Sequence, residues 1–302
     1  MASADPRSAD TQAAPLRDAA TVVLARDSDD GIEVFLQRRV KQMAFAGGMT
    51  VFPGGGVDPR DSDADLAWTG PEPSWWAHQF STSVELAQAL VCAAVRETFE
   101  ECGVLLASAG EDFPDPSSLR ADRDALVDKS ISFADFLRAR QLTLRADLLR
   151  PLAHWITPVN EKRRYDTRFF LAAVPPGQEP DDSTSEAEVA RWAGAQGALD
   201  AWSAGKHFLL PPTWAQLTEV ARFATVDELL AAQRTIEAIE PSVSAGKAWR
   251  AWLFRDPTTI SPDSASNCRP RSRSESHHEP AGPSRRPRIL DVGECGGADV
   301  DR

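Results

Sequence analysis

The sequence predicts a mixed α+β domain with a polar segment at each end. Two β-rich runs flank an Asp-Gly pair near the start, a long amphipathic helical pattern covers residues 84–102, and two more β-rich runs surround a basic turn after residue 150. A chain of 302 residues is long enough to bury a full core. We expect a disordered leader at 1–17, a domain at 18–255 and a disordered tail at 256–302, because both ends are poor in apolar residues.

The first strands are expected to form a hairpin. Residues 21–25 and 32–37 are rich in β-formers, and the Asp-Gly pair between them is a turn signal. The stretch "MTVFPGGGVD" predicts a short strand that ends at Pro53 and its glycines. Residues 57–83 are polar, contain prolines and are rich in tryptophan, so they indicate an ordered insertion.

The strongest helical pattern begins at Val84 and ends at Cys102. Its apolar residues recur every three or four positions, as the buried stripe of a helix requires; they are Leu86, Leu90, Val91, Ala94, Val95 and Phe99. Gly103 follows and can end the helix in the left-handed conformation.

The second half of the domain continues the mixed pattern. Residues 120–150 show another helical stretch. "PLAHWITPV" and "DTRFFLAAV" predict two strands joined by the basic turn "NEKRRY", and "EVARWAG" predicts one more. Helices are expected around 196–204 and 212–233, with Pro212 well placed at a helix start.

Composition narrows the function classes. A net charge of -12 and a pI of about 4.9 argue against a general nucleic-acid binder. The sequence has no apolar run that approaches a membrane span, and its start does not resemble a signal peptide, so we expect a cytoplasmic protein, monomeric or homodimeric. Four cysteines without CxxC spacing favour reduced thiols; they are Cys92, Cys102, Cys268 and Cys295.

Three glutamates crowd the end of the 84–102 helix in "AAVRETFEECGV". Glu97, Glu100 and Glu101 stand at i, i+3 and i+4, so their carboxylates share one face and repel one another. Carboxylates at this density suit Mg²⁺ or Mn²⁺, and Arg96 is placed to orient Glu100 one turn on. Taken alone, such a cluster is more often a solvated helix face.

The motifs around these glutamates change this interpretation. "RETFEECGV" resembles the second half of the Nudix box, and "FPGGGVD" resembles its upstream glycine half. Gly55 lies 41 residues before Arg96 instead of the 14 of a compact box, which indicates about 27 inserted residues. The glutamate expected eight residues before the arginine is Gln88, with Glu85 as a stand-in.

An interrupted box of this kind resembles the motif-19-type Nudix hydrolases, a coenzyme A diphosphatase-like branch. The resemblance covers roughly residues 19–254 and also includes "HWITP", "RYDTRFFLA" and "LLPPT". It implies a Nudix fold, which is a mixed sheet sandwiched between helices (α/β/α), here with the inserted loop and extra helices. It also implies hydrolysis of a P–O–P linkage.

The resemblance assigns roles to single residues. Glu97, Glu100 and Glu101 would ligate Mg²⁺ or Mn²⁺ together with the backbone carbonyl of Gly55. Family members differ in their general base, for which Glu100 and Glu186 are both candidates, and Arg96 completes the catalytic set.

Basic residues supply candidates for binding the substrate's phosphates. Lys162, Arg163, Arg164 and Arg168 surround a strand turn, and for the first three a solvated hairpin end is an equally good interpretation. Arg168 is the better candidate because apolar neighbours surround it. Arg39 and Gly48 match an upstream coenzyme A signature, but Ala44 replaces its second arginine, so the sequence does not mark coenzyme A.

The tryptophans of the insertion allow two interpretations. Trp68, Trp75 and Trp76, with His78, can form a lid that stacks on an adenine base, and Trp76 is the candidate ligand-binding residue. The more common alternative is a small core beneath a long loop, which we favour.

The expected function is metal-dependent hydrolysis of a nucleoside diphosphate linked to another moiety. Coenzyme A or an acyl-coenzyme A ranks ahead of ADP-ribose and dinucleotides, because the insertion and extra helices favour a bulky substrate. The alternatives are a nucleotide-sensing module without turnover and a triphosphatase for damaged nucleotides. The expected partner is a small organic diphosphate, with neither nucleic acid nor membrane involved.

Overall fold

The computed structural model describes residues 13–43, 46–63, 65–184, 187–242 and 288–291. The predicted hairpin forms its first two strands. β1 (Leu16–Ser28) and β2 (Gly31–Arg39) pair antiparallel around a tight turn, where Gly31 has a φ of 103°. Only glycine adopts such a φ without strain. β1 begins at Leu16, two residues before the predicted start of the domain.

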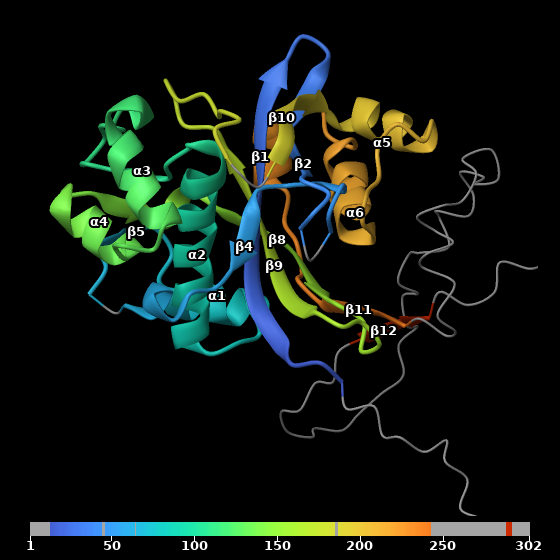
Figure 1. Ribbon diagram of the computed structural model, residues 1–302, viewed down its shortest axis with the longest axis horizontal. Coiled ribbons are helices and arrows are strands. Elements are labelled where there is room, and N and C mark those ends of the chain that lie inside the picture. The colour runs from blue at the N-terminus through green and yellow to red at the C-terminus, as the bar shows by residue number, and fades with distance from the viewer. Residues whose placement is uncertain (1–12, 44–45, 64, 185–186, 243–287, 292–302) are drawn as a thin grey trace, which may run out of the picture.

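The hairpin belongs to a mixed nine-stranded sheet in the order β10-β2-β1-β9-β8-β11-β12, with β3 paired to β2 and β4 paired to β1 (Figure 1). The further strands of this sheet are β3 (Thr50–Val51), β4 (Gly54–Gly56), β8 (Arg150–Ile156), β9 (Arg164–Ala173), β10 (Ala187–Gly194), β11 (Ala238–Ser242) and β12 (Arg288–Asp291). β1 runs parallel to β9 over ten residue pairs, which places β1 in the interior of the sheet. The strands predicted in "PLAHWITPV", "DTRFFLAAV" and "EVARWAG" are confirmed as β8, β9 and β10.

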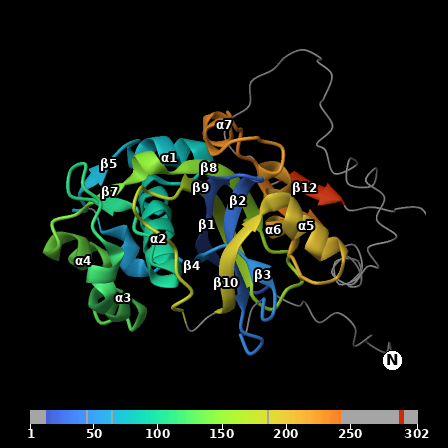
Figure 2. The same ribbon diagram turned by 90° about the horizontal axis from the view of Figure 1, so that it is seen from above.

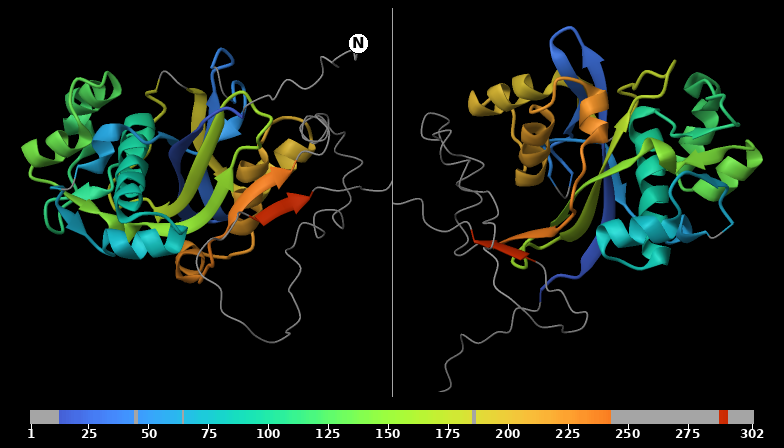
Figure 3. Two further views of the ribbon diagram at one scale, coloured as in Figure 1. Left: turned by 90° about the horizontal axis from the view of Figure 1, so that it is seen from below. Right: turned by 180° about the vertical axis from the view of Figure 1, so that it is seen from behind.

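Helices cover both faces of the sheet (Figures 2 and 3). They are α1 (Pro73–Phe80), α2 (Val84–Cys102), α3 (Arg120–Val127), α4 (Phe133–Ala139), α5 (Ala195–Ser203), α6 (Pro211–Val220) and α7 (Val226–Ala231). One core lies between the sheet and α1–α4, and a second lies between the sheet and α5–α7. The predicted α/β/α sandwich is therefore confirmed. None of the helices in the described ranges is long and apolar enough to cross a membrane.

α2 has the bounds that the sequence predicts. Ser83 caps its start, because its Oγ accepts a hydrogen bond from the Leu86 N–H at 3.1 Å. Gly103 ends the helix at a φ of 76° and donates its N–H to the Phe99 carbonyl. The apolar stripe is buried except at Leu86, which is partly buried, and the ring of Phe99 stacks on Phe136 of α4 with centroids 5.5 Å apart.

Two expected helical stretches are shorter than predicted. Residues 120–150 hold α3 and α4, followed by β7 (Thr143–Arg145) and the short helical turn Ala146–Leu148. β7 joins β5 (Trp68–Thr69) and β6 (Ala107–Ser108) in a small second sheet. The stretch at 212–233 divides into α6 and α7, since Thr225 caps a new helix through its side-chain oxygen. Apart from 288–291, the predicted tail lies outside the described residues, as do Cys268 and Cys295.

Candidate active site

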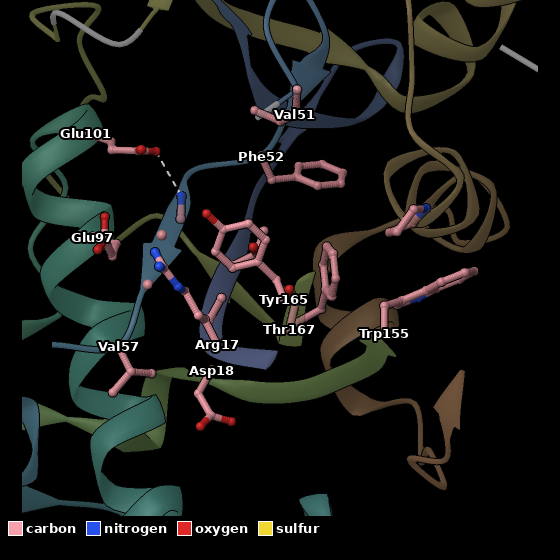
Figure 4. A pocket seen from close by; sticks show the side chains of 18 of the residues that line it. Arg17, Asp18, Val51, Phe52, Val57, Glu97, Glu101, Trp155, Tyr165 and Thr167 are labelled. Atoms are coloured by element: carbon pink, nitrogen blue, oxygen red, sulfur yellow. Dashed lines mark hydrogen bonds between the residues drawn. The ribbon is translucent and has the colours of Figure 1, made fainter. Parts of the chain in front are cut away.

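The glycine strand β4 brings the two halves of the box together. It pairs with β1 so that Gly55 lies opposite Ala20, and its other side faces α2. A Cβ atom on Gly55 would lie 2.6 Å from the carboxylate of Glu97, so only glycine allows this approach. The Gly54 N–H donates to Oε2 of Glu101 at 2.8 Å, which fixes the third glutamate to the same strand (Figure 4).

A buried arginine organises the cluster. Arg96 donates from Nε and Nη2 to the two oxygens of Asp61, both at 2.9 Å, and from Nη2 to the Gly56 carbonyl at 2.9 Å. Its Nη1 donates to Glu97 at 2.8 Å and reaches Glu100 at 3.3 Å, so the predicted contact with Glu100 exists. Burial by itself lowers the pKa of Arg96, but the bonds to Asp61 and the charges of Glu97 and Glu100 outweigh it and keep this pKa above its ordinary value.

Asp61 corrects our assignment of the box acid. The box acid is expected eight residues before Arg96, where this chain has Gln88. The Gln88 side chain donates to the Asp63 carbonyl at 2.7 Å, and the stand-in Glu85 is exposed. Counted forwards from Gly55, the same position is Asp61, six residues on, and its carboxylate is 2% exposed and bound to Arg96. The insertion therefore begins after Asp61. Counting six residues forwards from Gly55 would have identified this aspartate from the sequence.

Burial and mutual repulsion act on the glutamates of the cluster. Burial raises the pKa of Glu97 to about 7, with the Glu100 charge adding to the rise and Arg96 opposing it. Burial also raises the pKa of Glu100. One guanidinium, already bound to Asp61, thus faces two crowded carboxylates, with Glu101 beside them.

This donor set fits a hard divalent cation, since carboxylate and carbonyl oxygens are the ligands that Mg²⁺ and Mn²⁺ prefer. Within the described ranges, no three His, Cys, Asp or Glu side chains stand in a metal-binding arrangement. Arg96 accounts for this, because its Nη1 holds Glu97 and Glu100, while Glu101 turns to the Gly54 N–H. The residues therefore fit a divalent cation in their chemical type, their charge and their grouping.

The cluster lies in the wall of a cleft of about 1100 Å³ (Figure 4). One wall is β4 and α2, with all three glutamates. Another wall is the face of the sheet, where side chains from β1, β8 and β9 line the cleft; they are Arg17, Ala19, Thr21, Trp155, Tyr165, Thr167 and Phe169. The start of α6 and the β2–β4 segment close the rest, with Arg39 and Phe52 among the lining residues.

Arg39 thus lies where a substrate-binding residue is expected, whereas Arg164 and Arg168 do not. Along β9, Tyr165 and Thr167 face the cleft, so the alternate residues Arg164 and Arg168 point to the other side of the sheet. Arg164 pairs with Glu240 at 2.8 Å, and Arg168 pairs with Asp18 at 2.9 Å and Asp166 at 3.0 Å. The strand's two-residue alternation therefore corrects both assignments.

Trp76 is also corrected. Its side chain is 0% exposed, stacks on Phe80 with centroids 6.1 Å apart and contacts Phe170 of the sheet. No ring face is left for a base, so the alternative interpretation, a core beneath the insertion, is right. Cys92 and Cys102 are buried free thiols, as expected, and burial raises the pKa of Cys102 to about 12. Glu186 lies outside the described residues.

The comparisons with known proteins agree with this geometry. Residues 76–223 match the model of the NUDT19 Nudix domain. The chain is 31% identical over 210 residues to a putative nudix hydrolase 7 of Caenorhabditis elegans, an alignment that covers 68% of this chain and 61% of the relative. It is 26% identical over 254 residues to the human acyl-coenzyme A diphosphatase NUDT19, covering 70% of this chain and 67% of the relative.

A crystal structure of a Nudix hydrolase from Alicyclobacillus acidocaldarius superimposes with a TM-score of 0.62 at 31% identity. The alignment covers 74% of this chain and 98% of that one. The curated relatives are longer, since the chain spans 61% to 67% of their lengths. The fold, the interrupted box and these similarities together show that the chain belongs to the Nudix hydrolase family, in its NUDT19-type branch.

Proposed function

We propose that the chain is a Mg²⁺- or Mn²⁺-dependent pyrophosphohydrolase that splits the diphosphate linkage between a nucleoside and a second moiety. The observation that carries this proposal is the meeting of Glu97, Glu100 and Glu101 with the glycine strand in the wall of one large cleft. Membership of a hydrolase family makes the same chemistry the natural use of this site.

The metal would be held by the carboxylates of Glu97, Glu100 and Glu101 and by the Gly55 carbonyl. When bound, it would lower the pKa of the attacking water and neutralise charge on the phosphates. Arg96 acts as a positioning residue, because it bonds to Glu97 and Glu100 and is itself fixed by Asp61. Its charge also lets the two carboxylates stay close together.

Glu100 is our candidate for the general base. An oxygen of its carboxylate would take the proton of the attacking water, because Glu100 lies in the wall of the cleft beside the other two glutamates. Glu186 remains a second candidate from the sequence. The leaving group would depart as a phosphorylated half of the substrate.

Coenzyme A or an acyl-coenzyme A is our first choice of substrate. Relatives from Xenopus laevis, human and chicken that share 24% to 26% identity are named acyl-coenzyme A diphosphatases. The cleft adds support, since about 1100 Å³ exceeds what a drug-sized ligand needs. ADP-ribose or a dinucleotide is the alternative substrate, and nucleotide sensing without turnover is the alternative function.

The test is turnover of coenzyme A, acetyl-coenzyme A, ADP-ribose, NADH and a nucleoside triphosphate, with and without Mg²⁺ or Mn²⁺. Glu100→Gln removes a proposed ligand, so kcat should fall by orders of magnitude while the Tm holds. Glu85→Gln makes the same change at an exposed position of α2 and is expected to act as wild type. Binding without turnover in the wild type would favour the sensing alternative.

A further inference from the structure

Arg17 lies in the wall of the cleft without an acidic partner among the described residues. It lies in β1, its side chain is exposed, and within the described part of the chain it makes neither a hydrogen bond nor an ion pair. Two other arginines that line the cleft are held by acids: Arg96 by Asp61, and Arg123 by Asp181 at 2.8 Å. A guanidinium that pairs with no acid among the described residues, in a chain of net charge -12, is available for an anion from solution.

One aromatic side chain lies beside this arginine, and a second lies farther along the same face of the sheet. In the parallel pair of β1 and β9, Arg17 stands opposite Tyr165, and in the pair of β8 and β9, Trp155 stands opposite Thr167. All four residues line the cleft. Figure 4 shows the Arg17 side chain rising between β4 and the ring of Tyr165, with Trp155 farther along the wall.

The distance to the glutamates suits a single long ligand. Gly55, which abuts Glu97, pairs with Ala20, three residues along β1 from Arg17. Three residues of a strand span about 10 Å. A phosphate at Arg17 would therefore lie next to the carboxylate cluster in the same cleft, with Tyr165 on its other side.

We propose that Arg17 binds a phosphate group of a nucleotide and that Tyr165 stacks on its base, which makes this face of the sheet the nucleotide subsite of the cleft. The planar guanidinium donates two parallel hydrogen bonds to phosphate oxygens, and an aromatic ring accepts any base face. The choice of a nucleotide rests on the proposed function, but the binding of one does not require turnover. Trp155 extends the same platform.

The test uses the full-length protein in EDTA and measures the Kd of adenosine 3′,5′-bisphosphate, AMP and adenosine by calorimetry. Arg17→Ala should raise the Kd of adenosine 3′,5′-bisphosphate roughly 10- to 100-fold, as loss of a charge-assisted hydrogen bond does, and leave that of adenosine unchanged, while AMP shows which phosphate Arg17 binds. Arg17→Lys should recover part of the loss. Arg222→Ala, which removes an exposed arginine after α6, is the matched control and should bind as wild type.

The two phosphorylated ligands locate the phosphate. If Arg17 binds the 3′-phosphate, the variant loses affinity for the bisphosphate alone; if it binds the 5′-phosphate, it loses affinity for both. Either result supports the subsite. An unchanged Kd for both, an equal loss for adenosine, or no binding by the wild type overturns it.

Tyr165 gives an independent arm. Tyr165→Leu should weaken all three ligands, adenosine included, whereas Tyr165→Phe should keep most of the affinity because the ring remains. Equal Kd values for the Leu and Phe variants would overturn the stacking role. Nucleotide binding that depends on Arg17, together with no hydrolysis in the Mg²⁺ panel, would defeat the proposed function and leave this inference standing.

Discussion

At the scale of single residues, the site depends on a buried ion pair that a short aspartate supplies. Asp61 is 2% exposed, accepts two hydrogen bonds from Arg96 and also lies 3.7 Å from the Cys92 thiol. Removing one partner of a buried pair leaves an uncompensated charge, here the guanidinium that positions Glu97 and Glu100. The stability of the fold and the order of the site are therefore linked at one position.

Asp61→Ala should lower the free energy of unfolding by about 3–5 kcal/mol. Denaturant unfolding measures this. Asp63→Ala is the matched control in the same loop, because Asp63 pairs with Arg138 at the surface and should cost about 1 kcal/mol or less. Equal losses in the two variants would show that the Asp61–Arg96 pair contributes no more to the free energy of unfolding than the surface pair does.

The raised pKa of Glu97 predicts a pH dependence of stability in the metal-free protein. Its ordinary value is 4.5 and its value in the folded chain is about 7, so between these pH values the folded state binds more protons than the unfolded state. The contribution of this group to the free energy of unfolding therefore falls as pH rises from about 4.5 through 7.

Thermal unfolding in EDTA between pH 5 and pH 8 tests this sign. The Tm of the wild type should decline more steeply than that of Glu97→Gln, which cannot titrate, while Glu85→Gln should follow the wild type. Added Mg²⁺ should restore the Tm at pH 8 in the wild type and have less effect in Glu97→Gln. Parallel curves for the wild type and Glu97→Gln would refute the assignment of this pKa.

At the scale of elements, the geometry of the site is set by the packing of α2 against the glycine strand. The sequence predicted α2 with its bounds, because its cap residues and apolar stripe are local signals. It could not predict that β4 pairs with β1 or how closely Gly55 approaches Glu97, since those contacts join segments 35 and 42 residues apart. The alternation along β9 is a local signal too, yet which face meets the cleft depends on the neighbouring strands.

Gly55→Ala tests the contact between these two elements. The new Cβ would lie 2.6 Å from the Glu97 carboxylate, so it should displace that carboxylate and raise the Kd for Mn²⁺ at least roughly 10-fold. Mn²⁺ binding is measured by calorimetry or electron paramagnetic resonance. Gly197→Ala in α5 meets no atom within 4 Å and should bind Mn²⁺ as the wild type does. Unchanged affinity in Gly55→Ala would argue against a metal at this place.

At the scale of the whole molecule, the cleft is assembled from segments spread over most of the described chain. β1, the box, β8, β9 and the start of α6 all contribute lining residues, and Pro241 of β11 is the last of them. Residues 288–291 add β12 to the edge of the sheet, beside β11.

Deletion of residues 260–302 should leave kcat/KM on the preferred substrate within about twofold of the full chain, because the cleft-lining residues in the described ranges all precede residue 242. Steady-state kinetics of the truncated and full chains measures this ratio. Deletion of residues 292–302 alone keeps β12 and separates the effects of the two parts of the tail. A large fall in kcat/KM in the shorter deletion would assign a role to residues 292–302, and one in the longer deletion alone would assign it to 260–291.

Local sequence patterns were enough to predict the fold class, the helix with its three glutamates, the hairpin and the family resemblance, because each rests on periodicity, turn chemistry or motifs within short segments. Tertiary structure alone decided that Asp61 is the partner of Arg96, that Trp76 is core, and that Arg164 and Arg168 face away from the cleft. It also placed Arg17, which we expected in a disordered leader, in β1 and in the wall of the cleft. These outcomes depend on which strands pair and which face each presents, and the pairing of β1 with β9 joins residues almost 150 positions apart.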